Sequence, residues 1–446
     1  MLFMKSPVRF VPLSWRGAWL AALPLILSAG FAGAAQVSHV IQMSLDGLGA
    51  KYLQFYVTNA PAQFPNFRRL MAEGAFTFNA RCDVDLSETI PNHASIFTGR
   101  PVLQPAGASN TVHHGYNVNF PPAGDTFHIS GNANVPYKSS FFDVAHDFGL
   151  TTALYAGKTR IGICDRSYDG TNGALDFINT DNGRDKIDFA SVPAADISGT
   201  SISNGVTPLI QDLALTNALP KRYSFIHIAE PDLTGHSANW GTPAWSNAVR
   251  NVDAQVGRIL NAIDAHPALS NRTALIVSAD HGGGGVSRNG HTEAYHITNY
   301  TIPFFLRAPG IPAGADLYPL FANRGNPGTN RTDYNTQPQP IRNGDGGNLA
   351  LGLLGLPPIP GSFMVPALVF PEPSLTMARF MGQVTVFWAD PVGEYRLEAT
   401  ETHSSPSDWQ PITDGIATND TTRVFAVTNA AELSARFFRL HRLPPP

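Results

Sequence analysis

The amino-acid sequence predicts an α/β protein, in which a mostly parallel sheet flanked by helices is followed by a small C-terminal β-sandwich module. Two observations support this fold class. Short apolar runs rich in β-branched residues alternate with helical segments over most of the chain, which favours parallel strands joined by helical crossovers. Beyond about residue 370 the pattern changes to alternating strands alone, which predicts a separate module.

Size and charge narrow the class of protein. A chain of 446 residues with 43% hydrophobic content can bury a sizeable core, so one large domain and a smaller one are expected. The net charge is −4 and no basic tract stands out, which argues against a nucleic-acid-binding face. Charge says little more about partners, and a small-molecule partner is expected only from the motifs described below.

The first 35 residues predict a secretory signal peptide. Basic residues precede the apolar run "AWLAALPLILSAGFAGAA", which ends in small residues suited to cleavage near Ala34 or Ala35. A membrane anchor is the alternative, but the run is short and Pro24 interrupts it. We therefore expect export to the periplasm or extracellular space, without stable membrane insertion after cleavage. In that compartment Cys82 and Cys164 could form one disulfide or remain two unrelated thiols.

Five apolar runs predict the buried strands of the sheet, and two longer segments predict helices between them. The strands are "HVIQMSLDG", "TTALYAGK", "YSFIHIAEPD", "TALIVSADHG" and "TIPFFLRAPG", and the helices are "NFRRLMAEGA" and "WSNAVRNVDAQVGRILNAIDAHP". In open parallel sheets, ligands bind beyond the carboxyl ends of the strands. The polar residues of these runs sit at those ends.

Three carboxylates and three imidazoles follow the predicted strands, and together they form a ligand set for two divalent metal ions. Asp232 and His236 are four residues apart, so one helical turn places them on the same face. Nitrogen and oxygen ligands without thiolates favour Zn²⁺, with Mn²⁺ as the alternative. The predicted metal ligands are Asp46, Asp232, His236, Asp280, His281 and His291.

The stretch "SETIPNHASIFTGR", residues 87–100, predicts a short helix with a functional amino terminus. Pro91 suits the first turn of a helix and Gly99 suits its end, which places Thr89 at the amino terminus. The helix dipole and unpaired N–H groups at that end favour an anion such as phosphate. Alone, however, Thr89 could be an ordinary helix cap.

Taken in order, these motifs resemble the alkaline phosphatase superfamily, and within it the nucleotide pyrophosphatase/phosphodiesterase branch. The matching elements are Asp46, "TIPNH", "EPDLTGH" and "ADHGG". The resemblance implies an alkaline-phosphatase-like catalytic domain over residues 36–370, with Thr89 as both nucleophile and metal ligand. One ion would lie near Asp46, Asp280 and His281, and the second would be held by the other three ligands.

The resemblance also implies an asparagine that donates to a phosphate oxygen. "HGYNVN" places Asn119 at that position, with Asn117 as the alternative. For the third histidine ligand we favour His291 over His296, because Gly290 lets the backbone approach an ion closely. Lys158 ends a predicted strand and is interpreted as a solvated side chain.

The expected function is that of a secreted two-metal phosphoester hydrolase with a phospho-threonine intermediate. Diesters or pyrophosphates are the favoured substrates, because no phosphate-clamping arginine is expected near Thr89; Arg100 lies at the far end of the helix. The alternatives are an alkaline phosphomonoesterase and, from another class, a non-catalytic surface or carbohydrate-binding protein. Residues 371–446, with Trp409 and "ARFFRL", resemble a fibronectin-like β module that could contact a surface or glycan.

Overall fold

The computed structural model describes most of the chain, and its C-terminal part with gaps. The described residues are 37–176, 183–369, 375–380, 383–389, 395–401, 408–419, 422–427 and 437–443. The predicted signal peptide, residues 1–35, lies outside them. Within these ranges no helix is both long and apolar enough to cross a membrane.

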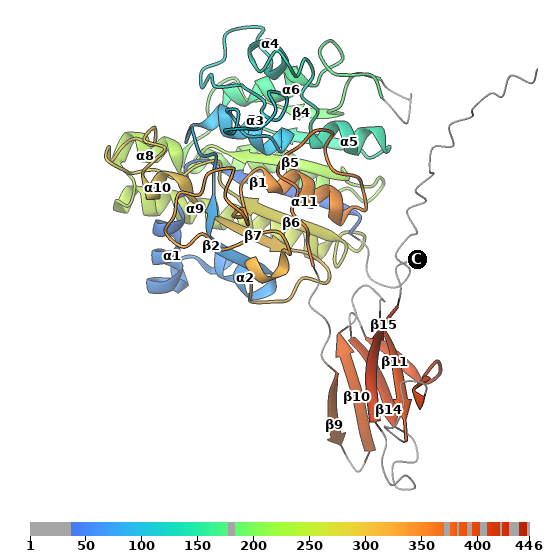
Figure 1. Ribbon diagram of the computed structural model, residues 1–446. Helices are drawn as coiled ribbons and strands as arrows, with labels where there is room; N and C mark the ends of the chain where they lie inside the picture. The colour runs from blue at the N-terminus through green and yellow to red at the C-terminus, as the bar shows by residue number, and fades with distance from the viewer. Residues whose placement is uncertain are drawn as a thin grey trace, which may run out of the picture. The chain divides into compact units, whose positions relative to one another are not determined.

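A sheet of eight strands forms the centre of residues 37–369 (Figure 1). Its strands are β1 His39–Leu45, β2 Ala75–Arg81, β3 Thr152–Tyr155, β4 Phe189–Ser191, β5 Tyr223–Ile228, β6 Thr273–Ser278, β7 Thr301–Arg307 and β8 Ala315–Asp316. Their order is β4-β3-β5-β1-β6-β7-β2-β8. β1 pairs in parallel with β5 and β6, β3 pairs in parallel with β4 and β5, and β7 runs antiparallel to β6 and β2. The prediction of a mostly parallel sheet is confirmed.

Helices cover both faces of this sheet (Figure 1). One group consists of α1 Ala50–Asn59, α2 Pro65–Glu73, α7 Ile202–Leu213 and α9 Pro243–Ala265, and the other of α3 Thr89–Thr98, α5 Phe141–Asp147 and α11 Asp345–Leu353. The shorter helices are α4 Phe127–Ser130, α6 Gly162–Ser167, α8 Asp232–Ala238 and α10 Ile297–Tyr300. Because helices bury the sheet on both sides, every residue of β1, β5 and β6 is buried.

The described elements of the C-terminal part of the chain are all strands, and these strands form two antiparallel sheets. The strands are β9 Thr376–Phe380, β10 Gln383–Ala389, β11 Tyr395–Thr400, β12 Gln410–Pro411, β13 Ile416–Asn419, β14 Thr422–Val427 and β15 Phe437–Arg442. The sheet orders are β13-β14-β10-β9 and β12-β11-β15. Side chains from both sheets share one apolar cluster that includes Trp388, Leu397 and Phe425. The predicted change to an all-β part is confirmed, whereas the fibronectin-like classification stays a prediction.

Both cysteines are buried in the larger part of the chain. Cys82 and Cys164 are free thiols that belong to its apolar core. Of the two alternatives that the sequence left open, the structure shows the unpaired one.

Candidate active site

The carboxyl ends of the parallel strands bring the predicted polar residues together. Asp46 follows β1, Asp232 begins α8 after β5, and Asp280 follows β6. The backbone N–H of Asp232 donates to the Asp46 carbonyl oxygen at 2.9 Å, so these two segments run in contact. Gly47 makes this approach possible, since its φ is +70° and an added Cβ would lie 2.9 Å from the Asp232 Cα.

Asp232, His236 and His291 form the first ligand group. α8 places His236 one helical turn after Asp232, as expected. The Nε2 atoms of His236 and His291 lie 3.4 and 3.5 Å from Asp232 Oδ1, and 3.2 Å from each other. Three potential ligand atoms therefore surround one point, and the His236 side chain, 45% exposed, faces solvent.

Asp46, Asp280 and His281 form the second ligand group. His281 Nε2 lies 3.5 Å from Asp46 Oδ1 and 3.4 Å from Asp280 Oδ2. All three side chains are completely buried. The Thr89 hydroxyl oxygen is 3.4 Å from the same His281 nitrogen, so the proposed nucleophile lies beside this group.

The hydrogen bonds of the three histidines leave one nitrogen of each ring ready to bind a cation. The Nδ1 atoms of His281 and His236 lie 2.7 and 2.8 Å from the carbonyl oxygens of Gly282 and Asn289. The Nδ1 atom of His291 contacts the Ser87 carbonyl oxygen in the same way. Because a carbonyl only accepts, each Nδ1 carries a proton, and in the neutral ring each Nε2 keeps its lone pair.

One oxygen of each carboxylate also lacks a hydrogen-bond partner among the described residues. These buried atoms are Asp46 Oδ1, Asp232 Oδ1 and Asp280 Oδ2, the same oxygens that face the histidine nitrogens. A buried, unpaired carboxylate oxygen is costly unless a cation binds it. The donor set thus fits two divalent cations with mixed nitrogen and oxygen ligands.

The charges of the site perturb its titratable groups. Burial alone would raise the pKa of Asp46, but Lys158 and His227 outweigh burial and hold that pKa well below its usual value. Burial and the negative charge of Asp46 raise the pKa of Asp280 well above its usual value. Burial, with His291 adding to it, lowers the pKa of His281 to about 3, so this ring is neutral at physiological pH.

Helix α3 carries Thr89 as its first residue. Glu88 is the residue that precedes the helix, and Gly99 ends it with φ +63° in the left-handed region. The predicted helix is therefore confirmed. The alternative that Thr89 is the helix cap is wrong, because the hydroxyl makes no capping bond and lies instead beside His281 and Arg160.

An arginine lies next to Thr89, contrary to the sequence-based expectation. Arg160 Nη2 donates to the Thr89 hydroxyl at 3.2 Å, and its Nη1 donates to the Asn119 carbonyl oxygen at 3.4 Å. The guanidinium also packs on the Phe120 ring, 4.9 Å from its centroid. Arg100 points to carbonyl groups at the other end of α3, as expected. Arg160 was missed because it is 71 residues from Thr89 in the chain.

Asn119, which follows α3 in the chain, lies next to the amino end of that helix. Its Oδ1 atom accepts from the Ile90 N–H at 3.1 Å, whereas Asn117 is exposed. The Asn119 amide nitrogen is thereby turned away from that N–H group. Its donation to a phosphate oxygen stays a prediction.

Lys158 is buried, so its interpretation as a solvated side chain is wrong. Its side chain is 0% exposed, and Nζ lies 2.7 Å from Asp46 Oδ2 and 2.6 Å from Asp232 Oδ2. A lysine can be buried when carboxylates compensate its charge. Those carboxylates are distant in sequence, which is why the local pattern did not reveal the pairing.

Sequence reasoning also missed His227, which lies near the carboxyl end of β5. Its Nδ1 accepts from the Gly157 N–H at 3.2 Å, so its Nε2 carries the proton and donates to Asp46 Oδ2 at 3.0 Å. The signal was present, because a histidine in a fully buried strand must have a polar partner.

The structure separates the two candidates for the third histidine ligand. His291 lies in the first ligand group, while His296 precedes α10 and its Nδ1 pairs with the Thr298 hydroxyl at 2.8 Å. This placement agrees with the preference for His291. Its role as a metal ligand stays a prediction.

Trp240 packs the loops of both ligand groups together. Its indole N–H donates to the Gly47 carbonyl oxygen at 2.9 Å, and its ring centroid lies 5.3 Å from His236 and 6.0 Å from His291. An added Cβ on Gly235 or Gly283 would lie 2.4 or 2.2 Å from the Trp240 ring. Glycine at both positions therefore makes room for the indole.

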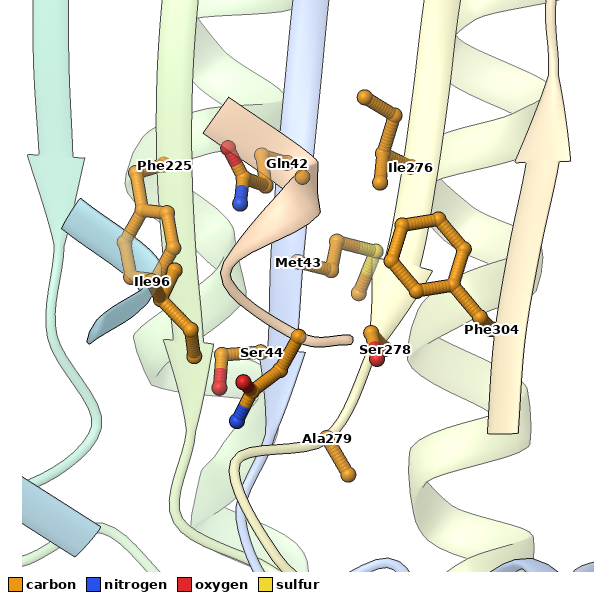
Figure 2. Close-up of a pocket in the computed structure, with 11 residues that line it drawn as sticks. Gln42, Met43, Ser44, Ile96, Phe225, Ile276, Ser278, Ala279 and Phe304 are labelled. Carbon is orange, nitrogen blue, oxygen red and sulfur yellow. The ribbon is translucent and has the colours of Figure 1, made fainter. Parts of the chain in front are cut away.

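A small cavity lies between the sheet and helices α3 and α11 (Figure 2). Its volume is about 10 Å³, and Met43, Ser44, Ile276 and Phe304 are among its lining residues. Such a volume holds about one water molecule. Near Thr89, the side chains of Arg160 and Asn119 are partly exposed.

Comparison with known proteins identifies one matching family, described as type I phosphodiesterase / nucleotide pyrophosphatase, over residues 40–104 and 129–333. These stretches contain Thr89 and both ligand groups, whereas Asn119 falls in the unmatched segment between them. Ectonucleotide pyrophosphatase/phosphodiesterase family member 3 of Mus musculus is 28% identical over 247 residues, which are 54% of this chain and 24% of that protein. The chain thus spans about a quarter of the length of this relative.

Solved structures with similar folds are more distant in sequence. Human ectonucleotide pyrophosphatase/phosphodiesterase 5 is 14% identical, with 72% of this chain and 96% of that chain covered and a TM-score of 0.46. A protein of the alkaline phosphatase superfamily from Vibrio parahaemolyticus is 13% identical, with 85% and 84% covered and a TM-score of 0.44.

Proposed function

Because the chain belongs to the type I phosphodiesterase / nucleotide pyrophosphatase family, we propose that it is a secreted, two-metal phosphoester hydrolase that acts through a phospho-Thr89 intermediate. The observation that carries the proposal is the convergence of two ligand groups near one buried hydroxyl. Thr89 Oγ1 is 3.4 Å from His281 Nε2 of the second group. Zn²⁺ is the favoured ion and Mn²⁺ the alternative.

In the proposed reaction, the two ligand groups and helix α3 with Thr89 have different roles. Two divalent cations, one held by Asp46, Asp280 and His281 and one by Asp232, His236 and His291, would supply Lewis acidity that lowers the pKa of a hydroxyl and stabilises negative charge on phosphoryl oxygens. The Thr89 oxygen forms a bond to phosphorus while the bond from phosphorus to the leaving alcohol breaks. Water then cleaves the phospho-threonine and restores the hydroxyl. The amino end of α3 and the Arg160 guanidinium both favour the phosphoryl anion at this position.

Hydrolysis of monoesters is the second candidate function, and Arg160 is the observation that favours it. The preference for diesters depended on the lack of an arginine near Thr89, yet Arg160 Nη2 lies 3.2 Å from the Thr89 oxygen. A guanidinium can donate two parallel hydrogen bonds to the oxygens of a dianionic phosphoryl group. Monoester and diester hydrolysis are thus both retained as proposals.

Export and the division of the chain near residue 370 belong to the same proposal. Export is supported by the basic and apolar pattern of residues 1–35, and the division by the change to an all-β part. The role of residues 371–446 in contact with a surface or glycan is likewise proposed. Sequencing the amino terminus of the exported protein tests the cleavage site near Ala34 or Ala35.

The test of the mechanism combines turnover with direct detection of the intermediate. The full chain is assayed with a nitrophenyl monoester, a nitrophenyl diester and a nucleoside-monophosphate ester, before and after chelation and re-addition of zinc. Thr89→Ala should lose turnover by about 10⁴-fold or more, as is typical of a lost nucleophile. Thr89→Ser should keep part of it, because it keeps a hydroxyl.

Acid quenching during turnover, followed by mass spectrometry, should find phosphate on the peptide that contains Thr89 in the wild type and on the serine in Thr89→Ser. Equal activity of Thr89→Ala and wild type would refute the assignment of the nucleophile. Full activity after exhaustive chelation would refute the role of metal ions.

A further inference from the structure

Lys158 lies between the two ligand groups, although it belongs to neither. It follows β3, and its ammonium group is completely buried. Nζ contacts Asp46 Oδ2 at 2.7 Å and Asp232 Oδ2 at 2.6 Å. A single cation therefore joins one carboxylate of the first group to one carboxylate of the second.

Gly157 allows the lysine to reach this place. An added Cβ at Gly157 would lie 2.8 Å from the Ala229 nitrogen and 2.8 Å from the His227 carbonyl oxygen. The segment between β3 and Lys158 thus lies directly against the end of β5. This close approach brings the lysine to the carboxylates of Asp46 and Asp232 from the side of β3.

The lysine uses one oxygen of each carboxylate and leaves the other oriented toward the histidines. Asp46 Oδ1 lies 3.5 Å from His281 Nε2, and Asp232 Oδ1 lies 3.5 Å from His291 Nε2. Neither Oδ1 atom has a hydrogen-bond partner among the described residues. Because rotation of a carboxylate would exchange its two oxygens, fixing Oδ2 also fixes the direction of Oδ1.

We propose that Lys158 is a shared positioning residue of the two-metal centre, which holds Asp46 and Asp232 so that the free oxygen of each faces its own ion. The inference rests on the proposed function, since it presupposes two bound ions. Lys158 also offsets part of the repulsion among three buried carboxylates. Loss of a residue that orients a metal ligand commonly costs 10- to 100-fold in metal affinity.

The bridging geometry makes a specific distinction between Lys158 and His227. Lys158 contacts a carboxylate of each ligand group. The hydrogen bonds of His227 go to Asp46 and the Gly157 N–H, and its ring packs against His93, so among the six predicted ligands it is hydrogen-bonded to Asp46 alone. Removal of Lys158 should therefore lower the binding affinity for both ions, and removal of His227 should lower the affinity for only one of them. A lysine with a purely structural role would lower thermal stability without changing the metal affinities of the folded protein.

The experiment measures zinc stoichiometry and affinity in the full chain by competition with a chromophoric chelator. Wild type should bind two zinc ions, and Lys158→Met should bind each of them with about 10- to 100-fold lower affinity. The matched control, His227→Gln, should lower the affinity for one zinc ion by a similar factor and leave the affinity for the other unchanged. Circular dichroism melting of the chelated proteins verifies that each variant is folded.

If Lys158→Met does not fold, Lys158→Gln carries the same comparison, because its amide keeps a donor without the charge. Unchanged or tighter binding of either ion in the folded variant would overturn the role of Lys158. Absence of zinc binding by the wild type would instead refute the proposed function. The two failures are thus distinguishable.

Discussion

Replacement of Arg160 by glutamine should lower monoester hydrolysis far more than diester hydrolysis. Arg160 Nη2 lies 3.2 Å from the Thr89 oxygen, so both terminal nitrogens of the guanidinium are near the position of a phosphoryl group attached to Thr89. A hydrogen bond to a charged group contributes about 1.5–3 kcal/mol. Two such bonds to a dianionic monoester contribute about 3–6 kcal/mol, and one bond to a diester contributes about half of that.

The difference between the hydrogen-bond energies of the monoester and the diester with Arg160 determines the expected change in substrate preference. Arg160 is partly exposed, so solvent screening favours the lower end of these values. A difference of about 1.5 kcal/mol is roughly a tenfold change in the ratio of kcat/KM for the two substrates. Arg160→Gln should therefore lower the ratio of monoester to diester kcat/KM by about tenfold or more.

The assay compares 4-nitrophenyl phosphate with bis(4-nitrophenyl) phosphate at saturating zinc, for wild type and for the Arg160→Gln and Arg160→Lys variants. Arg160→Lys keeps the charge but loses the planar fork, and it should fall between the other two proteins. An equal loss on both substrates would show that Arg160 only orders the loop at Asn119. An unchanged ratio with unchanged rates would exclude contact of Arg160 with the phosphoryl group.

Three further perturbations test other parts of the structure. His291→Ala should retain about one of two zinc ions in metal analysis and His296→Ala both, and the reverse result would transfer the ligand role to His296. Gly47→Ala should lower both stability and metal content, because its Cβ would lie 2.9 Å from the Asp232 Cα; a variant as stable and as metal-rich as wild type would contradict the close packing. Burial, with Arg222 adding to it, lowers the pKa of His39 from 6.5 to about 4. As pH falls, the unfolded chain thus binds this proton first, and the wild type should lose about 2 kcal/mol more stability than His39→Leu between pH 8 and pH 5 in urea denaturation; equal losses would contradict the buried, neutral state.

The sheet and both ligand groups could be predicted because the information lies within short motifs. Asp46, Asp232 and Asp280 each follow an apolar run, and parallel pairing of β1 with β5 and β6 brings the ends of those runs together. The four-residue spacing of Asp232 and His236 fixes their common face. In such cases the local pattern and the sheet topology determine position together.

Lys158 and Arg160 could not be placed in the same way. A polar residue after a strand is usually solvated, and only the positions of distant partners decide otherwise. Lys158 is separated from Asp232 by 74 residues, and Arg160 from Thr89 by 71. The expectation that no arginine lies near Thr89 was wrong for this reason, since it considered arginines near Thr89 in sequence and not in space.

The position of Trp240 allows its fluorescence to report on metal binding at the first ligand group. The indole is buried, and it lies against two histidines of the first ligand group. A paramagnetic cation such as Co²⁺ quenches the emission of a nearby indole, so occupancy of this group should be readable from unlabelled protein. Subtraction of the emission of Trp240→Phe isolates the signal from that of the other tryptophans, and the order in which the two ions bind then becomes visible in a single titration.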